Sequence, residues 1–286
     1  MDKKLALRIA PITADELHID EHVVMALGNA TKQIITHGAY INADGEDVYL
    51  EDDQELALAN TIVYTPHQMI PAARAKYPEL YGFVHNQTTL TVAHERYKLG
   101  YRVVLINCST LADTLTTSPQ LYRESILRSS SLLYCIEGAP LLADARDAFR
   151  DDTIVVSPEV PIFRSHEGDL LRSPWHADIV TAAPVYAVDV QLHTPSRAAE
   201  IPLAMARRAE RLVDAAAATS ANVLVLGAWG CGVYGNDPEL VATVLRVAFE
   251  RPAARSFAIV DVAVADTDPA TPLYQTFAKH FHEKIF

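Results

Sequence analysis

The sequence predicts a layered α/β fold built around a mainly parallel or mixed β-sheet. Two observations lead to this fold class. Short apolar, β-branched runs alternate with longer helical patterns in the C-terminal two-thirds of the chain, and a glycine-rich turn follows one of these runs. Half of the 286 residues are hydrophobic and 21% are charged, so a sizeable core can form. The chain shows no internal repeat, low-complexity tract or linker, and a single domain over residues 1–286 is the simplest description.

Residues 1–65 are expected to form an N-terminal helical and hairpin elaboration, and residues 66–286 the core of the domain. Apolar residues at helical spacing and turn residues between short β-branched runs give this division. The elements expected here are a helical region over residues 12–37, a hairpin turn at residues 42–45, a helix over residues 51–59 and a strand over residues 61–65.

In the core, helices and strands are expected to alternate. The patterns predict helices from Thr88 or Thr89 to Leu99 and over residues 121–135, 197–218, 238–250 and 273–281. Strands are predicted over residues 102–107, 153–156, 160–163, 178–181, 223–226 and 257–263. A polar loop over residues 108–120 separates the first of these strands from the helix that follows it.

The glycine-rich turn lies between the predicted strand Val223–Leu226 and a helix that begins near Pro238. It holds four glycines within nine residues. A strand, a glycine-rich turn and a helix N-terminus place bare backbone N–H groups around a concavity, which is a common way to hold a phosphate group. Asn236 or Asp237 can cap the helix, and Pro238 suits its first turn. A tight structural turn is the alternative interpretation.

Two further positions can carry chemistry. Asn107 ends a predicted strand, where its amide can bind a ligand hydroxyl. Glu124 falls in the first turn of the following helix, where a carboxylate can activate water or stabilise an oxocarbenium ion during glycosidic cleavage. Compensation of the helix dipole is the simpler role for such a residue.

The run Gly230-Cys231-Gly232-Val233-Tyr234-Gly235 also fits the G-x-G-x-x-G dinucleotide pattern, with Asp261 on a later strand. An NAD-dependent oxidoreductase is therefore a second functional class, although little chain follows the motif to build the usual nucleotide-binding half. Cys231 at a helix N-terminus is a candidate nucleophile, and a small residue in a crowded turn is the alternative.

Charge and composition exclude several classes of partner. The formal net charge is −12, which argues against general affinity for nucleic acids. No apolar run reaches the length of a membrane span, and the N-terminus lacks the apolar part of a signal peptide, so we expect a cytoplasmic protein. The three cysteines are expected to be reduced. No His, Cys or Asp cluster has metal-ligand spacing, so we expect no metal.

Five stretches of the chain closely resemble one family in the same order. They are Asn86–Leu90, Val104–Asn107, Glu124–Ser130, Ser157–Arg164 and Leu226–Pro238. The last reads Leu-Gly-Ala-Trp-Gly-Cys-Gly-Val-Tyr-Gly-Asn-Asp-Pro. Together they are similar to the microbial-type poly(ADP-ribose) glycohydrolases, a branch of the macrodomain superfamily.

This resemblance implies a three-layer α/β/α macrodomain-like sandwich with a mixed central sheet, an N-terminal helical extension and a site for ADP-ribose. It implies no cofactor. Glu124 corresponds to the catalytic acid, and Tyr234 to the aromatic residue beside the ribose and phosphates. The residues that correspond to the ligand site are Asn107, Gly230, Cys231, Gly232, Val233, Tyr234, Gly235 and Asn236.

The chain departs from the family where the catalytic loop is expected. Members that hydrolyse poly(ADP-ribose) carry three consecutive glycines after the strand that ends at Asn107, and then a Gln-Glu-Glu triplet. Residues 109–119 of this chain contain no glycine, and the triplet reads Tyr122-Arg123-Glu124. Two hypotheses follow: an ADP-ribosyl hydrolase of altered specificity that retains Glu124, or an inactive module that binds ADP-ribose or a related nucleotide.

Overall fold

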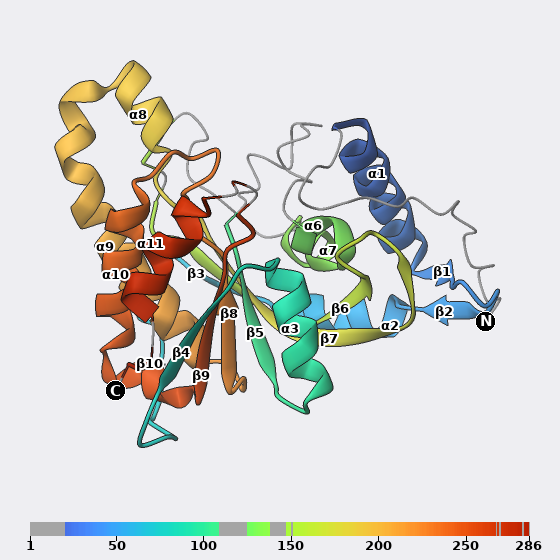
Figure 1. Ribbon diagram of the computed structural model, residues 1–286. Helices are drawn as coiled ribbons and strands as arrows, with labels where there is room; N and C mark the ends of the chain where they lie inside the picture. The colour runs from blue at the N-terminus through green and yellow to red at the C-terminus, as the bar shows by residue number, and fades with distance from the viewer. Residues whose placement is uncertain are drawn as a thin grey trace.

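The structure is a computed structural model that describes residues 21–108, 125–137, 147–149, 151–266, 268, 270–281 and 283–285. Within these residues an eight-stranded mixed sheet runs in the order β10-β4-β9-β8-β5-β7-β6-β3, and helices cover both of its faces (Figure 1). The predicted α/β/α sandwich is therefore confirmed. The Glu124 position and most of the predicted loop over residues 108–120 lie outside the described residues.

Five neighbouring strands of the sheet, β4, β9, β8, β5 and β7, are parallel to one another, and each strand outside them pairs antiparallel with its inner neighbour. The strands are β3 (Ile62–Tyr64), β4 (Tyr81–His85), β5 (Val103–Asn107), β6 (Ile154–Arg164), β7 (Leu170–Ala182), β8 (Val223–Leu226), β9 (Ile259–Ala263) and β10 (Glu283–Lys284). All five parallel strands thus have their carboxyl ends at one edge of the sheet.

Alternate residues of the central strands face opposite helical layers, as the period of two in a β-strand requires. Val104, Leu224 and Val260 belong to the apolar cluster on one face, and Leu105 and Val223 belong to the cluster on the other. Because both faces are covered, these strands read in the sequence as continuous apolar runs.

The first face is covered by α9 (Ile201–Ala217), α10 (Pro238–Phe249) and α11 (Pro272–Phe281). The second is covered by α3 (Thr89–Lys98), α6 (Ser125–Ser129) and α7 (Leu132–Ile136). Side-chain caps fix where two of these helices begin: the Thr88 hydroxyl accepts the N–H of Thr91, and the Asp237 carboxylate accepts the N–H of Glu239.

The N-terminal part of the described chain forms a small unit beside the second helical layer. It consists of α1 (Glu21–His37), the hairpin of β1 (Ala39–Ile41) and β2 (Asp47–Tyr49), and α2 (Glu51–Ala59). Its apolar cluster includes Leu133 and Phe163 of the core, so the hairpin and α1 pack onto α7 and β6. The predicted hairpin is confirmed.

Several predicted elements differ from those observed. The strands predicted over residues 153–156 and 160–163 are one strand, β6, with a bulge between Ser157 and Val160. The predicted helix over residues 121–135 is two helices where it is described, because the Ser130 hydroxyl bonds back to the Ile126 carbonyl and accepts the N–H of Leu132. Elements not predicted are β4, β10, α8 (Ala187–His193), η1 (Pro195–Glu200) and η2 (Pro252–Ser256).

Candidate ligand site at the carboxyl edge of the sheet

The candidate site lies where the neighbouring strands β5 and β8 end. Asn107 is the last residue of β5, and the loop over residues 227–236, called here the glycine loop, follows β8 directly. In open α/β sheets, ligands bind in the crevice outside the carboxyl ends of parallel strands. The structure therefore brings Asn107 and the predicted phosphate loop to the edge of the sheet where a ligand is expected.

Local hydrogen bonds and two left-handed glycines fold the glycine loop. The N–H of Cys231 donates to the Ala228 carbonyl at 2.9 Å, and the N–H of Asn236 donates to the Gly230 carbonyl at 3.0 Å. Gly230 and Gly235 have φ angles of 79° and 66°, which side-chain-bearing residues rarely adopt. These positions require glycine for the shape of the loop.

Residues 182–188, called here the supporting segment, pack against the glycine loop. The Trp229 indole N–H donates to the Ala182 carbonyl at 2.8 Å, and the Asn236 side-chain amide donates to the Val185 carbonyl at 2.8 Å. A Cβ on Gly230 would lie 2.6 Å from the Cβ of Pro184. Asn236, predicted as a ligand residue, is thus buried and holds the loop against its support.

The middle of the glycine loop has backbone N–H groups that are available to bind a ligand. Among the described residues, the N–H groups of Gly232 and Val233 have no hydrogen-bond acceptor. Within the part of the chain that the structure describes, a Cβ placed on Gly232 would meet no atom within 4 Å, so this glycine borders open space there. Two adjacent N–H groups next to open space are suited to an anion such as a phosphate.

Tyr234 connects the glycine loop to the end of β5. Its hydroxyl donates to the Cys108 carbonyl at 3.0 Å, and its ring packs edge-on against Tyr186. Asn107 is buried, and its amide donates to the Thr181 hydroxyl of β7 at 3.2 Å. The predicted residues at the ends of β5 and β8 are therefore held in one connected framework.

Cys231 lacks the electrostatic properties of a nucleophile. Burial, together with the nearby charge of Asp237, raises the pKa of its thiol to about 12. Since the thiolate is the reactive form, the thiol stays protonated and unreactive near neutral pH. The interpretation of Cys231 as a small residue in a crowded turn fits the structure better.

Asp261 is not available to bind a ribose. Its side chain is fully buried on β9, and its oxygens accept hydrogen bonds from His85 at 2.8 Å and from the Arg96 guanidinium at 2.6 and 2.8 Å. Burial alone would raise the pKa of this carboxyl, but these bonds outweigh burial and lower it. Through these bonds Asp261 joins β4, β9 and α3. It is therefore not available as the acidic ribose ligand that the dinucleotide-binding interpretation requires.

The role of the supporting segment was not identified from the sequence. Residues 178–181 were expected to form a strand, but β7 continues to Ala182, and Pro184 then turns the chain past the loop. A proline directly after an apolar strand is a signal that could have directed attention to this segment.

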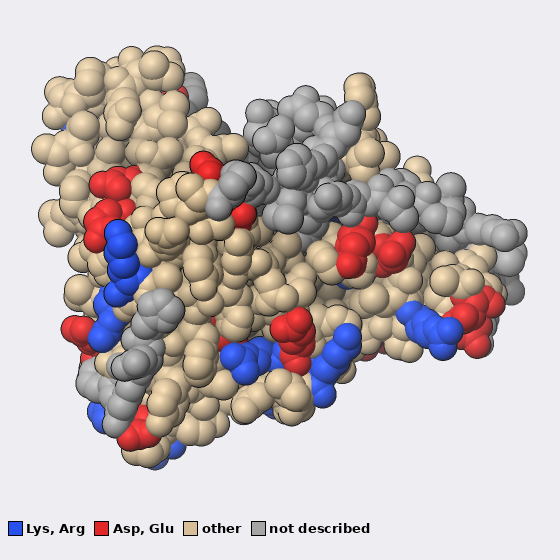
Figure 2. Space-filling model, viewed as in Figure 1, with Lys and Arg blue, Asp and Glu red and all other residues tan. Residues whose placement is uncertain are grey.

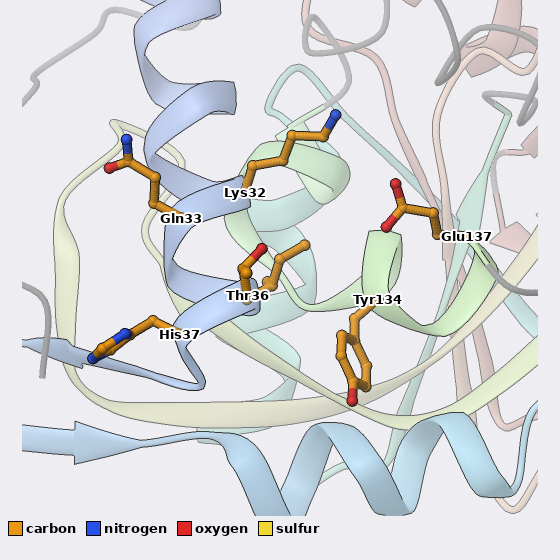
Figure 3. Close-up of a pocket in the computed structure, with 7 residues that line it drawn as sticks. Lys32, Gln33, Thr36, His37, Tyr134 and Glu137 are labelled. Carbon is orange, nitrogen blue, oxygen red and sulfur yellow. The ribbon is translucent and has the colours of Figure 1, made fainter. Parts of the chain in front are cut away.

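Elsewhere on the described surface, a cavity of about 690 Å³ lies between α1 and α7. Figure 3 shows Lys32, Gln33 and His37 on α1, Tyr134 on α7 and Glu137 directly after α7. None of the predicted site residues lines it. On the face in Figure 2, Lys and Arg side chains lie near Asp and Glu side chains, and the described residues form no broad basic surface there.

The described residues hold no group of three or more His, Cys, Asp or Glu that could bind a metal ion. No helix among them is both long enough and apolar enough to cross a bilayer.

Comparison with known proteins agrees with the fold. Residues 28–165 match the family described as microbial-type PARG, catalytic domain. The poly(ADP-ribose) glycohydrolase of Thermomonospora curvata superposes with a TM-score of 0.79 at 28% identity, covering 91% of this chain and 100% of that one. Its complex with the inhibitor ADP-HPD gives 0.78 at the same identity and coverage.

The Deinococcus radiodurans enzyme in complex with ADP-ribose superposes with a TM-score of 0.71 at 27% identity, covering 79% of this chain and 96% of that one. The comparison with curated proteins gives no match.

The fold and the glycine loop therefore define a macrodomain-like α/β/α protein. The predicted resemblance to the microbial-type poly(ADP-ribose) glycohydrolases is confirmed. The solved structures described above are bacterial poly(ADP-ribose) glycohydrolases.

Proposed function

We propose that the protein binds ADP-ribose at the carboxyl edge of its parallel strands and hydrolyses an ADP-ribosyl O-glycosidic bond. One observation carries the binding part of this proposal: among the described residues, the adjacent N–H groups of Gly232 and Val233 have no acceptor, and Gly232 borders open space. The complexes of related bacterial enzymes with ADP-ribose and with an inhibitor support the same ligand.

In this proposal the glycine loop surrounds the diphosphate. The N–H groups in its middle donate to the phosphate oxygens, and the Tyr234 ring lies beside the ribose and phosphates. Asn107 is buried at the end of the adjacent strand, and in this proposal it supports the ribose side of the site by holding the Thr181 hydroxyl. Cys231 and Asn236 contribute through the backbone path of the loop, since the thiol is protonated and the Asn236 amide is committed to the Val185 carbonyl.

Glu124 is the proposed general acid. It directly precedes α6 in the sequence. The Glu124 carboxyl gives its proton to the leaving oxygen as the bond from that oxygen to the anomeric carbon breaks. A water molecule then forms the new bond to the anomeric carbon and gives a proton to the Glu124 carboxylate, so that ADP-ribose and a free hydroxyl are the products and the acid is restored.

A second function, ADP-ribose binding without hydrolysis, is favoured by one specific observation. Residues 109–119 contain no glycine where the hydrolytic members of the family carry three in succession. Without glycines the backbone approaches a diphosphate and a distal ribose less closely, and hydrolysis depends steeply on such positioning.

Incubation with three substrates distinguishes the two functions: ADP-ribosylated protein, ADP-ribosylated nucleic acid and free poly(ADP-ribose). The proposal predicts release of ADP-ribose from at least one of them. ADP-ribose binding without release from any substrate would support the inactive module instead. Absence of both binding and release would contradict both functions.

A further inference from the structure

A buried arginine on α9 lies outside the proposed ligand site and is bonded to the segment that supports it. The Arg208 side chain is 4% exposed. Its Nε donates to the Asp152 carboxylate at 2.9 Å, and its Nη1 donates to the Ala183 carbonyl at 3.1 Å. Its Nη2 donates to the Phe149 carbonyl. One guanidinium therefore links α9 to two other stretches of chain, residues 149–152 and the segment around Ala183.

Ala183 lies within the supporting segment, between the residues that hold the glycine loop. The Ala182 carbonyl accepts from Trp229, and the Val185 carbonyl accepts from Asn236. The Val188 N–H donates to the Tyr234 carbonyl at 3.2 Å. A displacement of Ala183 would therefore change the position of the loop whose N–H groups face the ligand space.

The neighbouring arginine provides a matched comparison. Arg207 also donates to the Asp152 carboxylate, from its own Nε. Its side chain is 55% exposed, and within the described chain it has no recorded bond to the supporting segment. The two residues share one carboxylate and one helix, but only Arg208 reaches the Ala183 carbonyl.

We propose that Arg208 is a positioning residue for the glycine loop: it fixes the supporting segment at Ala183 and so sets the geometry of the N–H groups that receive the diphosphate. This inference rests on the proposed function for the identity of the ligand, but the effect on the loop itself can be measured without ligand. Lysine at this position would keep the charge and lose the planar set of donors that bonds Ala183 and Phe149 together.

The test compares Arg208→Lys with Arg207→Lys by ADP-ribose calorimetry, by hydrogen exchange of the loop amides without ligand, and by urea unfolding. We expect Arg208→Lys to raise the Kd for ADP-ribose about tenfold, the scale of one lost charged hydrogen bond, and to speed exchange at residues 229–236. Arg207→Lys is expected to change Kd by less than about twofold, the scale of a surface ion pair.

A double-mutant cycle separates positioning from general loss of stability. Trp229→Phe removes the indole bond to Ala182 and keeps an aromatic ring, so it weakens the same path from the loop side. If Arg208 acts through the supporting segment, the effects of Arg208→Lys and Trp229→Phe on loop exchange will be less than additive. If Arg208→Lys does not fold, hydrogen exchange of the loop amides in Trp229→Phe is the deciding measurement. Unchanged exchange in that variant would show that the supporting segment does not position the loop, and it would overturn the inference.

Equal effects of the two arginine variants, or wild-type exchange and affinity in Arg208→Lys, would overturn the inference. If the wild-type protein does not bind ADP-ribose, the proposed function fails, and hydrogen exchange of the unliganded loop still decides whether Arg208 positions it.

Discussion

The carboxyl and amino edges of the parallel strands present opposite kinds of polar group. At the carboxyl edge, the glycine loop offers backbone N–H donors, and the nearby Cys231 thiol is protonated. At the amino edge, two cavities of about 410 and 480 Å³ share Arg102, Glu159 and Asp178. The cavities at the amino edge are therefore lined by carboxylates, and the N–H donors without acceptors lie at the carboxyl edge, where they suit an anionic ligand.

The polar groups of the amino edge are paired with one another. The Asp178 carboxylate accepts the N–H of Glu159 at 3.0 Å, and Arg102 forms an ion pair with Glu159 at 2.7 Å. Glu159 has a φ angle of 51°, at the bulge of β6. The comparison indicates that donors without acceptors distinguish the edge proposed to bind a diphosphate from the amino edge, where the polar groups are paired.

The largest effect is expected at the catalytic position. Glu124→Gln should lower the rate of ADP-ribose release about a hundredfold or more, because an amide cannot transfer the proton that the leaving oxygen needs. Binding of ADP-ribose should stay nearly unchanged, since in the proposed function the diphosphate contacts come from the glycine loop. Single-turnover kinetics and calorimetry on the same variant measure both quantities. Hydrolysis at the wild-type rate would remove Glu124 from the mechanism.

The buried Asp261 gives the next largest effect, on stability. Its folded pKa lies below the usual value, so its contribution is present above the unfolded pKa and is lost as pH falls through the folded pKa. Asp261→Asn should cost about 3 kcal/mol at neutral pH by leaving Arg96 without its charge partner. Urea unfolding at several pH values checks this, and the variant should show a smaller loss of stability in acid than the wild type.

Two glycines of the loop should respond differently to the same substitution. Gly235→Val should destabilise the fold by about 2 kcal/mol, because a Cβ there would lie 2.3 Å from Val188 and the φ angle is positive. Gly232→Val should leave thermal stability near wild type and abolish ADP-ribose binding, because its side chain would enter the ligand space. Thermal unfolding and calorimetry measure the pair; tight binding by Gly232→Val would place the ligand elsewhere.

The smallest effect is expected at the amino edge. Burial raises the pKa of the Asp178 carboxyl, so its contribution to stability is present below the unfolded pKa and is lost as pH rises through the folded pKa. Asp178→Asn should remove this loss, change stability at neutral pH by less than about 1 kcal/mol, and leave ADP-ribose affinity as in the wild type. A marked loss of affinity would mean that the two edges are not separate in function.

The layered fold could be predicted because its central strands are buried on both faces, and runs such as Val223–Leu226 therefore stand out as continuous apolar segments. β4 was missed because its apolar residues do not mark its buried face: Tyr81 and Phe83 are exposed, and the buried residue between them is Gly82. The break between α6 and α7 depends on one side-chain bond of Ser130, which no apolar periodicity reveals.

The glycine loop was predicted from local chemistry, because its glycines and the Asp237 cap act within a few residues. The roles of its members were harder to assign. Asn236 is a buried anchor because Val185, 51 residues earlier, supplies a carbonyl acceptor. The pairing of Asp261 with His85 and Arg96 likewise depends on contacts made only in the folded sheet.

Calorimetric titration of the wild-type protein with ADP-ribose, with adenosine as the control ligand, tests the central claim most directly. If the N–H groups of Gly232 and Val233 receive the diphosphate, ADP-ribose will bind with measurable heat and raise the Tm, and adenosine, which lacks phosphate, will bind far more weakly. No heat and no thermal shift at millimolar ADP-ribose, or equal binding of adenosine, would contradict the account.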